Sequence, residues 1–390
     1  MIKKIKGAWN HAPFLLENFV LFQNIILHVS LIDGVGPVAL FDLIERLGPH
    51  RLPDVYNFFV SDFLQLGFSE KVAQNLVDGL KNQQILMQEI ELMEKYQVQC
   101  VTLLCPQYPK MLKEIHVPPV ILYFQGDINL FAHEKTLACV GARKAHRYVY
   151  DALQALVVPM MHDGWIMVSG GAQGADTYVH TISLEQNSPT IVVVGSGLCH
   201  VYPPQNKKLF DRVVASGGLI VSLFSMQTNP DPWNFPQRNR IISGLSKGCL
   251  VLQAAAKSGA LITAECALQQ GREVFALPGS IFDDLSAGCH NLIQQGAKLV
   301  TSSKDILDEL GYVLPTETIQ EKKLQKTIFT PTVPCDDLSL QILNCAVTSI
   351  TADLLLSKLQ VDVEVLQTKL FELSLDGKIA QDGMGFWKRT

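Results

Sequence analysis

Short apolar segments alternate with helical segments through the middle of the chain, and this alternation constrains the fold most. Six such segments lie between positions 100 and 310: Leu137–Val140, Trp165–Val168, Thr190–Val194, Leu219–Val221, Cys249–Gln253 and Glu273–Leu277. Strands that are apolar on both faces are typical of a parallel sheet covered by helices on either side. The sequence therefore predicts an α/β fold with a Rossmann-like, doubly wound and mostly parallel sheet.

We place this sheet domain at residues 100–312, and the regions on either side of it have different sequence patterns. Residues 1–99 carry apolar positions at helical spacing and predict an all-α domain. Its Gly-x-Gly turn at Asp33–Pro37 resembles half of a helix-hairpin-helix element, although a turn that only packs two helices is favoured because it holds no basic residue. Residues 313–335 predict a linker. Residues 336–390, with three helical patterns and a terminal hairpin pattern, predict a winged-helix domain.

Composition limits the functional classes. The 390 residues include 32 Lys plus Arg against 37 Asp plus Glu, a net charge of −5 that excludes a uniformly basic nucleic-acid coat but permits a local basic patch. Nine cysteines without a CxxC pair indicate reduced thiols in a cytoplasmic protein. Because no window holds 18 uninterrupted apolar residues, we expect no membrane association.

Glycine-rich turns follow three of the expected strands. The turns are Gly141–Arg143, Ser169–Gly174 and Gly195–Gly197. In an open parallel sheet these turns emerge together at the carboxyl edge, where ligands bind. Glycine lets backbone N–H groups approach an anion, and the following helix N-terminus favours negative charge. A phosphate site is therefore favoured over three ligand-free turns.

A second feature is a local concentration of positive charge. The segment Pro232–Gly248 contains three basic residues and no acidic one. Guanidinium groups such as those of Arg238 and Arg240 can hold phosphate oxygens, and the preceding rings of Trp233 and Phe235 can stack on unpaired bases. The alternative is a solvated charged turn ahead of a helix.

Cofactor-binding and catalytic motifs are weak. The turn at Gly195–Gly197 lacks the third glycine of a dinucleotide fingerprint, and no Walker A motif is present. Asp176 and His180 share one helix face, which more often means a local hydrogen bond than a catalytic pair. The ten histidines show no metal spacing. We expect no cofactor, no metal, no catalytic residue and no enzymatic activity.

Ordered motifs along most of the chain resemble one known family. They are Val140–Arg143, Val168–His180, Tyr202-Pro203, Phe235–Ser246, Ser258–Ala264, Gly271–Gly279 and Asn291–Ala297. These segments are similar, in the same order, to motifs of the DNA-processing protein A family (DprA, also called Smf). This sequence differs from the family pattern at three positions. Gln173 stands where the family usually has Arg, Ala142 where it has Ser or Thr, and Gln253 where a Glu commonly ends the strand.

The resemblance implies a cytoplasmic protein that binds single-stranded DNA, forms a homodimer, protects incoming DNA and promotes loading of RecA recombinase in natural transformation and recombination. It also implies a sterile-alpha-motif-like N-terminal domain. Its motifs place the DNA contacts at the edge of the sheet, and we add Lys247 for its charge. The expected DNA-binding residues are Gly141, Arg143, Ser169, Gly170, Gly171, Gln173, Arg238, Asn239, Arg240 and Lys247.

Two alternatives remain at this point. One is a nucleotide-binding or nucleotide-hydrolysing enzyme of the lysine-decarboxylase-like Rossmann type, although Pro278-Gly279 lacks the rest of that class's Pro-Gly-Gly-x-Gly-Thr turn. The other is duplex binding by the C-terminal domain. Its expected third helix, Glu364–Leu375, has one Lys and two Glu, which disfavours docking in a DNA groove and favours a protein contact.

Overall fold

The computed structural model describes residues 13–312, 337–347, 350–359, 361–382 and 386–389. The chain divides into two compact units, 1–316 and 317–390, each with its own apolar core. None of the helices among the described residues is long and apolar enough to span a bilayer.

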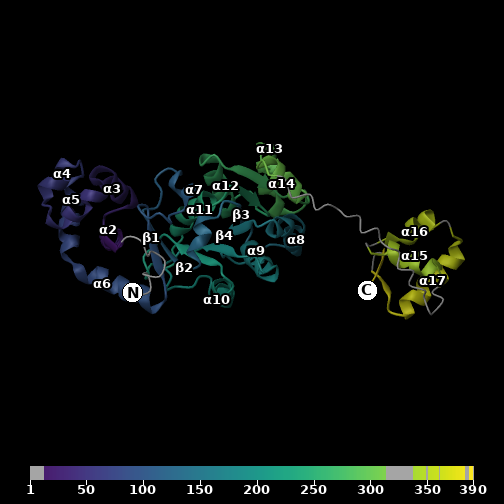
Figure 1. The fold of residues 1–390 in the computed structure, drawn as a ribbon. Coiled ribbons are helices and arrows are strands. Elements are labelled where there is room, and N and C mark those ends of the chain that lie inside the picture. Colours follow the sequence, from purple (N-terminus) through teal and green to yellow (C-terminus); the bar gives the residue numbers. More distant parts are fainter. Residues whose placement is uncertain (1–12, 313–336, 348–349, 360, 383–385, 390) are drawn as a thin grey trace. The chain divides into compact units, whose positions relative to one another are not determined.

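The first unit begins with helices (Figure 1). They are α2 (Pro13–Ser30), α3 (Pro37–Arg51), α4 (Val60–Gln65), α5 (Glu70–Lys81) and α6 (Gln83–Lys95), with a short 3-10 helix η1 (Leu52–Asn57) after α3. Local signals place their ends: Pro37 occupies the first turn of α3, and the Ser69 side chain accepts the Val72 N–H at the start of α5. Leu43, Phe63 and Leu76 meet in their common core.

A nine-stranded sheet follows, in the order β1-β2-β6-β5-β4-β3-β7-β8-β9. The strands are β1 (Gln99–Thr102), β2 (Ile121–Gly126), β3 (Thr136–Val140), β4 (Ile166–Ser169), β5 (Thr190–Val193), β6 (Leu219–Ser222), β7 (Gly248–Val251), β8 (Glu273–Ala276) and β9 (Lys298–Leu299). From β6 to β9 the neighbours are parallel, whereas β1 and β2 are antiparallel additions. The predicted mostly parallel α/β fold is confirmed, and β1, β2 and β9 were not predicted.

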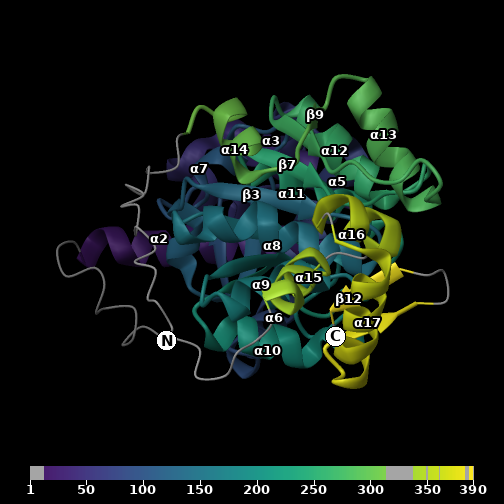
Figure 2. The same ribbon diagram turned by 90° about the vertical axis from the view of Figure 1, so that its right-hand side faces the viewer.

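Helices cover both faces of this sheet. They are α7 (Lys110–Lys113), α8 (Arg147–His162), α9 (Ala175–Glu185), α10 (Lys207–Ala215), α11 (Asn234–Gly244), α12 (Gly259–Gln269), α13 (Ala287–Gln294) and α14 (Ser303–Glu309), with short 3-10 helices η2 (Ile128–Ala132), η3 (Pro204–Asn206) and η4 (Asp284–Ser286). Alternate residues of β3 face opposite layers: Leu137 packs with α8 and α9, and Ala138 packs with α11 and α12. Figure 2 shows α8 and α9 on their face of the sheet.

The helical segment of the first unit packs directly on the edge of the sheet. Leu86 and Met93 of α6 share a core with Cys100 of β1 and Tyr123 of β2. The buried Glu89 carboxylate of α6 accepts the Met226 N–H at 2.7 Å. Burial raises the pKa of Glu89, and the bond to Met226 opposes that rise. The predicted boundary at residue 99 thus falls inside one compact unit, and a separate domain of a particular type there stays a prediction.

The second unit is small and has a separate core. Its elements are α15 (Asp337–Cys345), β10 (Ile350–Thr351), α16 (Ala352–Leu359), α17 (Val363–Leu375), β11 (Ile379–Gln381) and β12 (Phe386–Arg389), with the strand order β10-β12-β11. Ile342, Leu355 and Leu370 meet in its interior. The three helices and terminal strands follow the expected order, while the winged-helix assignment stays a prediction. The expected linker at 313–335 and the turn expected at 383–385 within the terminal hairpin pattern lie outside the described residues.

Candidate functional site

The glycine-rich turns converge at the carboxyl edge of the sheet, as the strand order requires. Val140 of β3 pairs with Val251 of β7, and Ser169 of β4 pairs with Val192 of β5, so these strands end at the same level. A Cβ built on Gly141 would lie 2.7 Å from the Ala175 Cβ, and the Ala175 N–H donates to the Ala142 carbonyl at 3.1 Å. The turn after β3 is therefore packed against the start of α9.

The turn after β4 needs glycine for two different reasons. Gly174 lies just before α9 with φ +81°, and a Cβ there would fall on the carbonyl oxygens of Ala142 and Arg143. A Cβ on Gly170 would fall on the guanidinium of Arg238. Backbone and side chains thus approach one another closely at this edge, which leaves room for nothing larger than hydrogen on these two residues.

Arg143 is exposed at this edge and has aromatic neighbours. Its guanidinium carbon lies 5.6 Å from the centroid of the Phe235 ring, and that ring lies 5.8 Å from the ring of Tyr202. Trp233, two residues before Phe235, is 81% exposed. The exposed Arg143 guanidinium and the neighbouring Phe235 and Tyr202 rings form a surface suited to a polyanion that carries flat bases. Gln173 is exposed in the adjoining turn.

The structure corrects the expected position of Arg238. Only 6% of this residue is exposed, and its Nη1 donates to the carbonyl oxygens of Gly170 and Val193, each at 2.5 Å. Burial lowers the pKa of Arg238 to about 10, so the group stays charged at neutral pH. Arg238 therefore fastens the turn after β4 to the end of β5 from beneath, instead of projecting from a solvated turn.

Asp176 lies close to Arg238 inside α9. Burial raises the pKa of Asp176, while the positive charge of Arg238 and the Ala172 N–H, which donates to Oδ2 at 3.1 Å, oppose the rise. His180 instead has its Nδ1 2.9 Å from Thr190 Oγ1. Ser169 is buried, and its Oγ donates to the Cys139 carbonyl at 2.7 Å. A hydrogen bond from the Ser169 side chain also opposes the rise in the pKa of Asp176. These three polar side chains brace the backbone below the edge, and His180 is directed at Thr190 and not at Ser169 or Asp176.

Asn239 and Arg240 point to other parts of the fold. The Asn239 amide donates to the Gly259 carbonyl at the start of α12, at 3.2 Å. Arg240 Nη1 donates to the Val117 carbonyl at 2.6 Å and to the His116 carbonyl at 3.2 Å. Burial lowers the pKa of Arg240. Both residues hold α11 in place, and the structure does not bring their polar groups to the surface around Arg143.

Lys247 is not part of this edge either. It immediately precedes β7, and its N–H donates to the carbonyl of Thr136, the first residue of β3, at 3.0 Å. Its ammonium lies 5.7 Å from the centroid of the Tyr312 ring. Lys247 thus lies at the amino ends of the strands, whereas the glycine-rich turns lie at their carboxyl ends. Charge alone could not distinguish these two edges.

Two features of the edge were not predicted as site residues. Tyr202, 39% exposed, joins the aromatic group through Phe235, and the only sequence signal for it is the Tyr-Pro motif. Gln253, two residues after β7, is 1% exposed, and its Nε2 donates to Asp283 Oδ2 at 2.8 Å. The hydrogen bond between Gln253 and Asp283 joins residues that are 30 positions apart, and no local sequence pattern indicates it.

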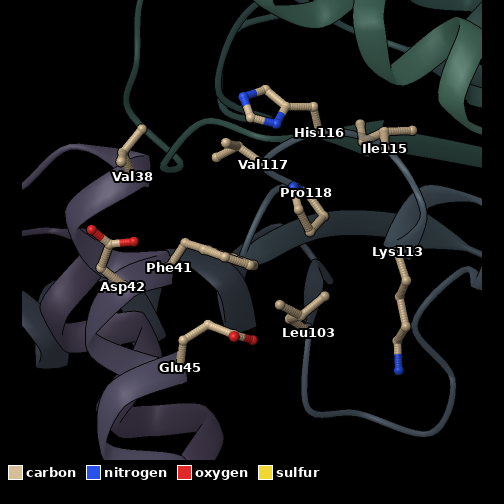
Figure 3. A pocket seen from close by; sticks show the side chains of 10 residues that line it. All are labelled: Val38, Phe41, Asp42, Glu45, Leu103, Lys113, Ile115, His116, Val117 and Pro118. Carbon is tan, nitrogen blue, oxygen red and sulfur yellow. The ribbon is translucent and has the colours of Figure 1, made fainter.

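A cavity of about 760 Å³ lies apart from this edge, between α3 and the segments around α7 (Figure 3). Asp42 and Glu45 stand on the α3 side, and Lys113 and His116 stand on the other (Figure 3). None of the predicted DNA-binding residues lines it. Arg240 donates hydrogen bonds to the carbonyls of two residues that line the cavity, His116 and Val117.

Comparison with known proteins points in one direction. A family model described as DNA recombination-mediator protein A matches residues 99–311. The DNA processing protein DprA of Bacillus subtilis (strain 168) is 44% identical over 204 residues, which are 52% of this chain and 68% of that protein.

Solved structures agree with the sequence match. The X-ray structure of DNA processing protein A (DprA) from Streptococcus pneumoniae is similar with a TM-score of 0.63 and 33% identity, covering 73% of this chain and 97% of that one. A structure that describes the single-stranded DNA binding mode of DNA processing protein A from Helicobacter pylori is similar with a TM-score of 0.50 and 27% identity, covering 56% of this chain and 98% of that one.

Proposed function

Because the chain belongs to the DNA recombination-mediator protein A family, we propose that it binds single-stranded DNA at the carboxyl edge of its sheet and takes part in DNA processing during transformation and recombination. The observation that carries this proposal is the exposed Arg143 beside the Phe235 and Tyr202 rings, next to two glycine-rich turns. The single-stranded DNA described for the Helicobacter pylori relative supports the choice of ligand.

The hydrogen-bond donors and the aromatic rings at the edge bind different parts of the DNA. Arg143 holds phosphate oxygens, and the N–H groups of the turns add neutral donors. The rings of Phe235, Tyr202 and Trp233 stack on unpaired bases. Neither contact distinguishes one base from another, so binding is nearly independent of sequence.

Arg238 contributes to DNA binding indirectly. By holding the carbonyls of Gly170 and Val193, it keeps these acceptors turned away from the bound phosphate and fixes the turn that carries the donors. Such preorganisation lowers the entropic cost of binding. Asn239 and Arg240 then contribute through the position of α11.

Two extensions rest on family membership. We propose that the protein acts as a homodimer, because two such edges on one strand raise avidity without new contacts. We also propose that it promotes loading of RecA recombinase, in keeping with the description of the family as recombination mediators. We assign no reaction to the edge, because the Ser169 hydroxyl donates to the Cys139 carbonyl and His180 is paired with Thr190.

The test is the affinity of labelled oligo-dT, measured by fluorescence anisotropy over a salt series. Arg143→Glu is expected to weaken binding by more than about tenfold at low salt, because it replaces a phosphate ligand by a like charge. Arg143→Gln is expected to reduce the slope of log K on log salt by about 0.7, the loss of one phosphate contact on a single strand.

Lys247→Glu is the matched control, because it makes the same charge reversal at the opposite edge. It is expected to leave the affinity within about twofold of wild type, since Lys247 touches no part of the proposed surface. An equal loss in both variants would mean that net charge, not the edge, governs binding. No binding of single strands by the wild-type protein at low salt would refute the proposed function.

A further inference from the structure

A second cavity, of about 710 Å³, opens at the same edge of the sheet, where the chain changes direction. β3 and β7 are neighbours, but β3 continues through α8 to β4 on one side and β7 continues through α12 to β8 on the other. The helices α8 and α12 lie on opposite faces. Crevices at such switch points are where open α/β sheets bind ligands, and the volume suits a small molecule.

Two aromatic rings stand at this cavity. Tyr148 lines the cavity and is 46% exposed, and its hydroxyl donates to the Pro278 carbonyl at 2.7 Å. Phe282 is 92% exposed on the loop after β8. An apolar ring so fully in water gains apolar contact once a flat ligand covers it.

The polar lining of the cavity is acidic and amide in character. Asp283 accepts the Leu285 N–H at 3.0 Å on Oδ1, and on Oδ2 it accepts Gln253 Nε2 at 2.8 Å and Ser286 Oγ at 2.9 Å. Oδ1 has one acceptor position left, whereas Oδ2 is fully used. Burial alone would raise the pKa of Asp283, but these three donors hold it below the usual value, so the carboxylate is charged at neutral pH.

This charge decides the class of ligand. The lining contains no Lys or Arg, and its one basic side chain, His146, lies 3.7 Å from Asp283 Oδ2. A phosphate group would therefore meet a carboxylate without a compensating cation. A neutral flat ring with an amino group fits both the exposed rings and the free acceptor of Asp283.

The cavity also adjoins the proposed DNA surface. His146 lies three residues after Arg143, a stretch of chain that reaches at most about 11 Å. Lys144 lies between these two residues and Arg147 follows His146, and both basic side chains are exposed. A strand whose phosphate is held at Arg143 thus has a neighbouring base within reach of the cavity.

We propose that this cavity, formed by Tyr148, Gln253, Phe282 and Asp283, binds one nucleobase that carries an amino group, stacked on the exposed rings. The base comes either from the DNA strand held at Arg143, in which case the inference rests on the proposed function, or from a free nucleoside. The site is distinct from the aromatic group around Phe235, which lies over the end of β5.

The test uses 2-aminopurine, an amino-bearing base whose fluorescence is quenched by stacking, placed at each position of an oligonucleotide in turn and also supplied as the free nucleoside. Phe282→Ala is expected to abolish the quenching and to weaken DNA binding about 5- to 20-fold through the loss of one stacked base. Ile281→Ala is the matched control, since this neighbour is 81% exposed but does not line the cavity.

Each outcome decides the matter. Phe282-dependent quenching with the oligonucleotide alone assigns the base to DNA, and quenching with the nucleoside as well assigns the site to free bases. Normal DNA binding without Phe282-dependent quenching in either arm overturns the inference and leaves the proposed function intact. If no DNA binds, the proposed function fails, and the nucleoside arm alone decides whether the cavity takes a base.

Discussion

At the scale of single residues, His180 shows how burial fixes a protonation state. Its Nδ1 lies 2.9 Å from Thr190 Oγ1, whose hydroxyl donates to the Met167 carbonyl at 2.7 Å. Since the threonine hydrogen is used, Nδ1 must carry the histidine hydrogen. The buried Nε2 has no partner among the described residues. Burial lowers the pKa of His180 to about 3, so the ring is neutral in the folded protein.

This neutrality makes stability depend on pH. Between about pH 6.5 and pH 3 the unfolded chain binds a proton at His180 and the folded chain does not, so the free energy of unfolding falls as the pH falls. The slope from this one group is about 1.4 kcal/mol per pH unit. Asp176, whose pKa burial raises, contributes with the opposite sign at the lower end of this range.

The two contributions are separated by a variant. His180→Gln is expected to remove most of the pH dependence that His180 gives to the free energy of unfolding, while the contribution of Asp176 remains. The measurement is urea unfolding of wild type and variant at several values between pH 4 and 7. The difference in free energy between them should shrink as the pH falls. A difference that stays constant with pH would show that the pKa of His180 is the same in the folded and unfolded states.

At the scale of secondary-structure elements, the turn that starts α9 depends on one glycine. Gly174→Ala is expected to destabilise the protein by about 2 kcal/mol, because φ is +81° there and the new methyl group would overlap the carbonyls of Ala142 and Arg143. The measurement is the denaturant midpoint at fixed pH.

Gly259→Ala, in the first turn of α12, provides the control for this change. No atom lies within 4 Å of a Cβ built there, and the helix favours Ala over Gly by up to about 1 kcal/mol. This variant should match or exceed wild-type stability. Similar losses in both variants would argue against the close packing of the β3 and β4 turns.

At the scale of the whole molecule, the separate cores of the two units predict separate responses to mutation. Leu370 of α17 is 2% exposed in the core of the second unit. Leu370→Ala is expected to destabilise that unit by about 2–4 kcal/mol. In scanning calorimetry only one transition should move, and oligo-dT affinity at the first unit should not change. A shift of the whole unfolding profile would show that the units unfold together.

Much of the architecture follows from local sequence patterns. The strands from β3 to β8 are apolar runs bounded by turn residues, and the order of strand, turn and helix sends all their turns to one edge. Arg143 and the glycines could therefore be placed by sequence. β1 and β2 could not, because β1 is four residues long and its strand pairing is with β2, some twenty residues away and antiparallel.

What only the tertiary structure decided is where each charge points. Sequence shows that Arg238, Arg240 and Lys247 are basic, yet their environments come from distant contacts: Arg238 reaches a carbonyl 68 residues away and Arg240 one 123 residues away. A long side chain can end in solvent or in the interior with the same local pattern, because burial depends on what packs against it. The sequence by itself thus determined the strands from β3 to β8, the edge to which their turns lead and the family, and the packing determined which of the predicted residues face solvent at that edge.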